Sequence, residues 1–69
     1  MDKVLYGFVE TCSTVVDGKE CHRVDYFKGF DATTASFICT KVTQLEDVRN
    51  DARHLANIHG IKHVRFMGV

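Results

Sequence analysis

The spacing of apolar and polar residues between positions 43 and 60 is that of an amphipathic helix. On a helical projection the apolar side chains fall within one stripe, and charged or polar residues fill the rest of the circumference. Thr43 and Glu46 have the spacing of a reciprocal capping box, and Gly60 followed by Ile61 has that of a Schellman-type end. The pattern therefore predicts one helix from Thr43 to Gly60. Its stripe consists of Leu45, Val48, Ala52, Leu55, Ala56 and His59.

Two stretches before this helix have the composition of strands in a hairpin. Residues 3–16 and 20–28 are rich in β-branched and aromatic side chains, and Asp17-Gly18 between them offers the positive φ angles of a two-residue turn. Neither face of the first strand is purely apolar. We therefore interpret Gly7 as a bulge that switches the two faces partway along the strand.

Two further stretches predict strands, one before the helix in the sequence and one after it. Residues 34–42 are dominated by β-branched and aromatic side chains. For residues 32–36, the sequence is compatible with a strand, a loop or a helical turn. Residues 61–67 predict a last strand in which Val64 and Phe66 share one face. The element order is β-β-β-α-β. We expect all 69 residues to form a single α+β domain, a small two-layer sandwich with the helix on one face of an antiparallel sheet.

The length and composition of the chain limit how large its core can be and which classes of partner it can bind. A chain of 69 residues buries only about 60% of its unfolded surface, so a homodimer interface would be an ordinary way to add stability. Nine basic and nine acidic residues give zero formal charge, which argues against a generic binder of nucleic acid or anionic membranes. The sequence shows neither an apolar run of about 20 residues nor a signal peptide. We expect a cytoplasmic protein without a membrane partner, in the host cytoplasm if a phage encodes it.

The sequence shows no spacing typical of a catalytic or metal site. Its three cysteines and four histidines lack the close pairs of a structural zinc site, and the neighbours Cys21 and His22 would point to opposite faces of a strand. Asp47 and Asp51 lie on the solvent side of the predicted helix, and turns, bulges or caps explain the glycines. We therefore expect buried, unreactive thiols, no enzyme activity, no cofactor and no bound metal.

Two surface features are candidates for binding a partner. Arg49 and Arg53, one helical turn apart, form a short basic ridge to which residues of the last strand could add. Aromatic side chains on the first two strands exceed what one sheet face can bury, so some are expected outside as interface anchors. A solvated mixed-charge helix and a core made from both strand faces are the alternatives. The candidate partner-binding residues are Tyr6, Tyr26, Lys28, Phe30, Arg49, Arg53, His63 and Arg65.

Three features together carry a resemblance to a known class of protein: the hairpin through Asp17-Gly18, the capped helix over residues 43–60 and the closing strand over residues 63–66. In size and element order the chain resembles the small sheet-plus-helix inhibitors that bacteriophages and other mobile elements encode, among them anti-CRISPR and anti-defence proteins. The resemblance implies a protein that occludes a partner's surface, and it assigns no individual binding residue.

The first hypothesis is accordingly a small non-enzymatic protein-binding inhibitor or adaptor of this anti-CRISPR-like kind. A nucleic-acid-binding module that acts as a dimer is the alternative, and its affinity would fall steeply between about 50 and 200 mM salt. A zinc-stabilised mini-domain that uses some of Cys12, Cys21, Cys39 and a histidine is the second alternative. Elemental analysis that finds no metal would exclude it.

Overall fold

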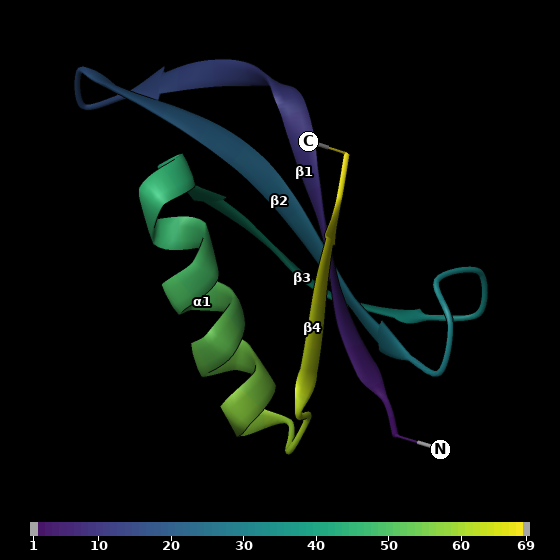
Figure 1. The fold of residues 1–69 in the computed structure, drawn as a ribbon. Coiled ribbons are helices and arrows are strands. Elements are labelled where there is room, and N and C mark those ends of the chain that lie inside the picture. Colours follow the sequence, from purple (N-terminus) through teal and green to yellow (C-terminus); the bar gives the residue numbers. More distant parts are fainter. Residues whose placement is uncertain (1, 69) are drawn as a thin grey trace.

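A computed structural model describes residues 2–68 as a four-stranded sheet with one helix against one of its faces (Figure 1). This architecture confirms the predicted α+β class and the order β-β-β-α-β. No helix within residues 2–68 is long and apolar enough to cross a membrane. The elements are β1 Val4–Val16, β2 Lys19–Gly29, β3 Ser36–Thr43, α1 Leu45–Ile58 and β4 His63–Met67.

The sheet has the strand order β3-β2-β1-β4, and it is mixed rather than antiparallel throughout. Strand β2 pairs antiparallel with β1 and β3, whereas β4 pairs parallel with β1. The helix accounts for this difference. Because α1 carries the chain back along the sheet, β4 starts near the end where β3 began and runs in the same direction as β3 and β1 (Figure 1). Strands β3 and β4 thus form the two edges of the sheet.

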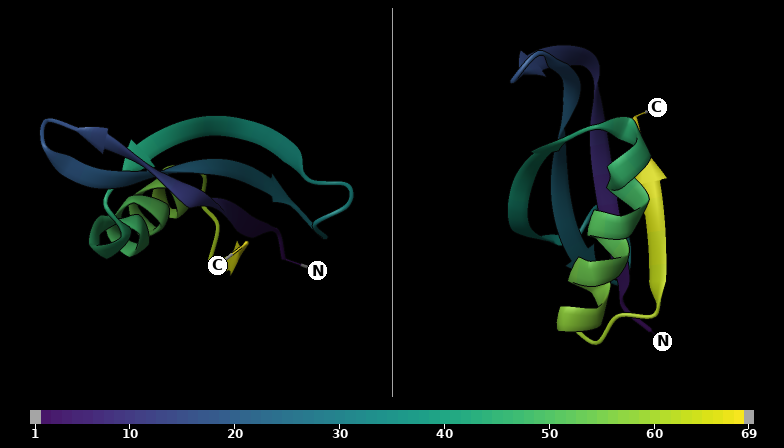
Figure 2. Two further views of the ribbon diagram at one scale, coloured as in Figure 1. Left: turned by 90° about the horizontal axis from the view of Figure 1, so that it is seen from above. Right: turned by 90° about the vertical axis from the view of Figure 1, so that its left-hand side faces the viewer.

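Asp17 and Gly18 form the predicted two-residue turn between β1 and β2. Their φ angles are 53° and 77°, as a hairpin turn of the mirror-image type I requires, and the flanking residues Val16 and Lys19 are paired. Residues 11–20 are all exposed, because this end of the hairpin extends beyond the helix (Figures 1 and 2). The molecule is consequently elongated, with principal extents of 42 × 22 × 16 Å.

The predicted bulge at Gly7 is wrong. The register of β1 against β2 is regular around Gly7 and shifts between Val9 and Ser13. Gly7 instead makes room for two rings: a Cβ at this position would lie 3.0 Å from a ring carbon of Phe66 and 3.3 Å from one of Tyr26. The missing side chain therefore serves close packing between three strands rather than a change of face.

The core lies between α1 and the sheet face that carries Leu5 and Val9 of β1. Leu5, Val24 and Tyr26 are the largest fully buried side chains. The middle of the predicted helical stripe packs on them, whereas Leu45 at one end of the stripe and His59 at the other are exposed. The core consists of Leu5, Val9, Val24, Tyr26, Val48, Ala52, Leu55, Ala56 and Ile61.

The predicted capping box at the start of the helix is wrong. Helix α1 begins at Leu45 with Gln44 as its N-cap, and no side chain caps it. Thr43 is still part of β3, where it pairs with His22 of β2. Strand pairing therefore continues one residue further than the β-propensity pattern indicates, and the helix starts later.

The Schellman-type end of the helix is confirmed. The Ile61 N–H donates to the Ala56 carbonyl at 2.8 Å, and the Gly60 N–H donates to the Asn57 carbonyl at 3.2 Å. Gly60 has a φ of 67°. This left-handed residue turns the chain so that Ile61 enters the core.

We expect Gly60→Ala to lower the free energy of unfolding by about 1 kcal/mol, because a side chain in the left-handed conformation strains the backbone. A Cβ at this position would meet no atom within 4 Å, so no steric clash adds to this cost. Gly60→Asn is the matched control, since asparagine tolerates this conformation better. Urea denaturation should give it the smaller loss, and equal losses would contradict a backbone origin.

A turn organised by Asp31 connects β2 to β3. Asp31 Oδ1 accepts hydrogen bonds from the backbone N–H groups of Thr33 and Thr34, each at 3.0 Å, and from the Thr33 hydroxyl at 2.6 Å. The Thr33 hydroxyl and the Thr34 N–H hold the pKa of Asp31 below its usual value. The turn covers residues 32–34, and β3 begins at Ser36, so the stretch 32–36 is a turn followed by the start of a strand.

Candidate functional site

No element within residues 2–68 covers the sheet face opposite the helix (Figure 2), which we call the open face. Side chains alternate between the two faces of a strand, so this face carries the neighbours of the core residues on each strand. Its members are Tyr6, Phe8 and Glu10 of β1, Arg23, Asp25 and Phe27 of β2, Phe37, Thr40 and Val42 of β3, and His63, Arg65 and Met67 of β4.

Three phenylalanines from three strands meet edge to face on the open face, and we call them the aromatic cluster. The ring centroids of Phe8 and Phe27 are 5.3 Å apart, and those of Phe27 and Phe37 are 5.4 Å apart, at interplanar angles of 85° and 69°. Phe37 exposes 59% of its surface, and Met67 beside Phe8 is also exposed. A contiguous apolar group left in solvent is typical of an interaction surface.

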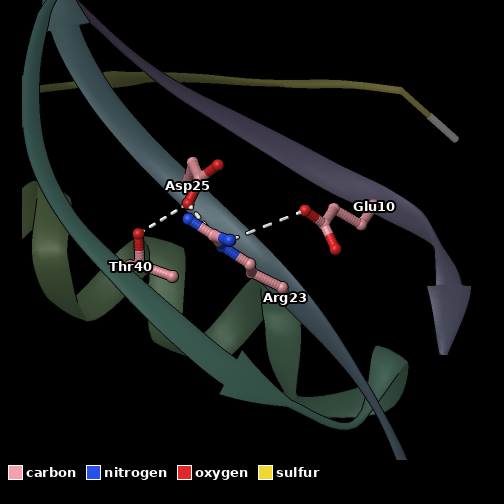
Figure 3. Close-up of polar contacts among 4 residues, drawn as sticks. All are labelled: Glu10, Arg23, Asp25 and Thr40. Atoms are coloured by element: carbon pink, nitrogen blue, oxygen red, sulfur yellow. Dashed lines mark hydrogen bonds and ion pairs between the residues drawn. The ribbon is translucent and has the colours of Figure 1, made fainter. Parts of the chain in front are cut away.

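A polar network borders the aromatic cluster on the same face (Figure 3). Asp25 Oδ1 accepts hydrogen bonds from Thr40 Oγ1 at 2.5 Å and from Arg23 Nε at 3.2 Å. Arg23 Nη1 lies 3.9 Å from Glu10 Oε1. Asp25 is the register partner of Phe8, so the network adjoins the cluster directly. An apolar centre with a polar rim is the usual composition of a protein-binding surface.

A second concave surface lies on the helix side of the sheet, between α1 and β4, and we call it the α1–β4 groove. Its volume is about 540 Å³. Val64 and Phe66 of β4 form an apolar floor, exposed by 36% and 40%, and cationic side chains stand on its rim. The groove is lined by Arg49, Arg53, Ala56, Asn57, Ile61, Lys62, Val64 and Phe66.

Five of the predicted partner-binding residues lie on these two surfaces. Tyr6, His63 and Arg65 belong to the open face, although the Tyr6 side chain is buried among its neighbours. His63 Nε2 lies 3.6 Å from a carboxylate oxygen of Asp2. Arg49 and Arg53 line the groove on the other side of the sheet. The structure thus separates the basic ridge from His63 and Arg65, whereas Lys62 of the predicted last strand lies with the ridge in the groove.

The other three predicted residues belong to neither surface. Tyr26 is fully buried in the core, which removes its side chain from any binding surface of the folded chain. Lys28 Nζ lies 3.3 Å from Nδ1 of His59 at the end of the helix. Phe30 is exposed beside Lys3, whose Nζ lies 6.0 Å from the ring centroid.

Sequence reasoning did not select Phe37 and Met67, although both are exposed on the open face. Phe37 meets Phe27 because the register of β2 against β3 shifts between Tyr26 and Phe27. Met67 lies beside Phe8 because β4 pairs parallel with β1. Both neighbours depend on strand pairing, so no local sequence signal identifies them.

The three cysteines are free and lie in different environments. Cys21 is buried and Cys39 is partly buried, but Cys12 is exposed. The expectation of buried thiols is therefore wrong for Cys12, because it lies on the part of the hairpin that extends beyond the helix. Within residues 2–68, no group of three or more histidine, cysteine or acidic side chains is placed to hold a metal ion.

No protein-family model, curated protein or solved structure matches this chain. The open face and the α1–β4 groove are therefore the features of this chain that bear on its function.

Proposed function

We propose that this chain is a small non-enzymatic protein-binding module, an inhibitor or adaptor that covers part of a partner's surface with its open face. The observation that supports this function best is the aromatic cluster on a sheet face that no described element covers. Phenylalanine rings fixed against one another offer a large apolar area and lose little side-chain entropy on binding. Phe37, the most exposed of the three, is the natural anchor.

The charges on the open face favour a protein over a nucleic acid as the partner. Arg23 is paired with Asp25 and lies close to Glu10, and the two arginines of the face, Arg23 and Arg65, are matched in number by these two carboxylates. Binding to a phosphate backbone depends on cations that are free to replace counterions. A balanced polar network beside an apolar cluster instead suits the mixed surface of a folded protein.

The resemblance to phage-encoded inhibitors in size and element order makes the anti-CRISPR and anti-defence proteins the first functional class to test. An inhibitor of this kind acts by occlusion, which requires a complementary surface and no catalytic group. A sheet face that presents an apolar cluster with a polar rim meets that requirement.

We expect Phe37→Ser to reduce capture of the partner protein at least about tenfold, because truncation of an aromatic anchor typically costs 2 kcal/mol or more. The tagged chain is incubated with lysate of its native host, with and without nuclease treatment, and captured proteins are quantified by mass spectrometry. Val15→Ser is the matched control, since Val15 is 72% exposed but lies on the distant hairpin arm.

A protein that is lost with Phe37→Ser and retained with Val15→Ser supports the proposal and identifies the target. If every captured protein is retained by both variants, or disappears on nuclease treatment alone, the proposal is contradicted. Sedimentation of the isolated chain provides a further test. A dimer that Phe37→Ser dissociates would show that a second copy covers the open face, and the proposed partner would then have to bind elsewhere.

A further inference from the structure

We infer that the α1–β4 groove is a second binding site, which takes an extended acidic segment of a partner protein as a fifth strand beside β4. The groove lies on the helix side of the sheet, away from the open face. The inference therefore goes beyond the proposed function, and it rests on different residues.

Strand β4 offers a free backbone edge to such a segment. It lies at the end of the strand order and pairs only with β1 within residues 2–68. About half of the backbone N–H and C=O groups of an edge strand point away from the sheet. An extended peptide can bind these groups through main-chain hydrogen bonds and place alternate side chains on each face.

The helix beside this edge gives the added strand an apolar surface to cover. Val64 and Phe66 point to the helix side, yet each leaves more than a third of its surface exposed. Ile61 and Ala56 extend the apolar lining toward the core. Side chains of an added strand that face α1 would lie next to Val64 and Phe66, as cross-strand neighbours do in any sheet.

The rim of the groove determines the charge of the segment. Arg49, Arg53 and Lys62 line the groove, whereas none of its lining residues is acidic. No ion pair within residues 2–68 involves these three cations. A chain of zero formal net charge thus concentrates three unpaired cations around one apolar floor. Carboxylates complement such a rim, and the apolar floor with its free strand edge favours a peptide over a phosphate backbone.

The spacing of the arginines indicates where the carboxylates belong. Arg49 and Arg53 are four residues apart on α1, which corresponds to a rise of about 6 Å. Alternate residues of a strand are about 6.6–6.8 Å apart and share one face. Helix α1 lies alongside β4 (Figure 2), and Arg49 and Arg53 line the groove between them. Acidic residues at alternate positions of an added strand would therefore match the two guanidinium groups. The preferred motif is therefore Glu-X-Glu in extended conformation.

Two capped peptides of identical composition test this geometry. Val-Thr-Glu-Thr-Glu-Thr directs both carboxylates to one face of a strand, whereas Val-Thr-Thr-Glu-Glu-Thr directs them to opposite faces. Each is titrated into the isotopically labelled chain, and NMR follows the amide signals. We expect the alternating peptide to bind up to about fivefold more tightly, because it can form one more exposed pair, which contributes up to about 1 kcal/mol. We also expect it to slow amide exchange in β4, as a new strand would.

Removal of the two arginine charges tests whether the preference for the alternating peptide depends on the groove. Arg49→Gln/Arg53→Gln should abolish the preference for the alternating peptide. The folded state should persist, because both side chains are exposed and unpaired within residues 2–68. Lys19→Gln/Lys41→Gln is the matched control, since it removes two positive charges from β2 and β3 and should keep the preference.

Several outcomes would overturn the inference. Equal affinity for the two peptides, unchanged binding by the arginine double variant, or peptide binding without slower exchange in β4 would each do so. Binding of a single-stranded oligonucleotide but of neither peptide would assign the groove to nucleic acid instead. The peptides are tested on the isolated chain, whereas the open face is tested in lysate, so a failure of one experiment leaves the other proposal standing.

Discussion

Leu5→Ala is expected to leave much of the chain unfolded at physiological temperature. Leu5 is completely buried and belongs to the core between β1 and α1. Truncation of a buried leucine typically costs about 2–5 kcal/mol, because apolar contacts are lost and a cavity remains. A core of this size rarely supplies more than about 3–5 kcal/mol in total. Circular dichroism during urea denaturation should show a much lower midpoint or no folded baseline.

Val15→Ala is the control for this experiment. Val15 is an apolar residue of the same strand, but it is 72% exposed on the hairpin arm. Its truncation should change the free energy of unfolding by no more than about 0.5 kcal/mol. If Leu5→Ala proved as stable as Val15→Ala, the face of β1 that carries Leu5 and Val9 could not pack against the helix.

Tyr26→Phe is expected to stabilise the chain by about 1–2 kcal/mol at neutral pH. The ring of Tyr26 fills the centre of the core, but its hydroxyl is buried without a hydrogen-bond partner within residues 2–68. A buried polar group without a partner costs about 1–3 kcal/mol, since it loses its bonds to water and gains none. Phenylalanine keeps the ring and removes that cost. A lower urea midpoint for Tyr26→Phe would show that the hydroxyl is hydrogen-bonded after all.

The effect of Tyr26→Phe on the free energy of unfolding is also expected to depend on pH. Burial, with additions from the charges of Asp51 and Cys39, raises the pKa of Tyr26 from 10.0 to about 12. Above pH 10 the unfolded chain gives up this proton while the folded chain keeps it, so the unfolded state is favoured. The corresponding stability is complete below pH 10 and is lost as the pH rises through 12. Urea denaturation across this range should show the advantage of Tyr26→Phe growing by about 2–3 kcal/mol. A constant difference would contradict a buried phenol.

Interactions between residues close in sequence determined the features that were predicted correctly. The helix over Leu45–Ile58 follows from a periodicity within the segment itself. The turn at Asp17-Gly18 and the helix end at Gly60 each depend on a glycine whose φ is positive. For the same reason, sequence reasoning could place Arg49 and Arg53 one turn apart on one side of the helix.

Pairing between distant strands decided the features that were not predicted correctly, because a residue's neighbours across a sheet depend on register. Whether Thr43 ended a strand or capped a helix was settled by its partner His22. The aromatic cluster and the α1–β4 groove likewise exist only once β3 and β4 take their places at opposite edges. The sequence alone therefore determined the elements of this protein and their order. Only the tertiary structure decided which side chains meet on each surface, since a shift of register changes every cross-strand contact without altering the local pattern.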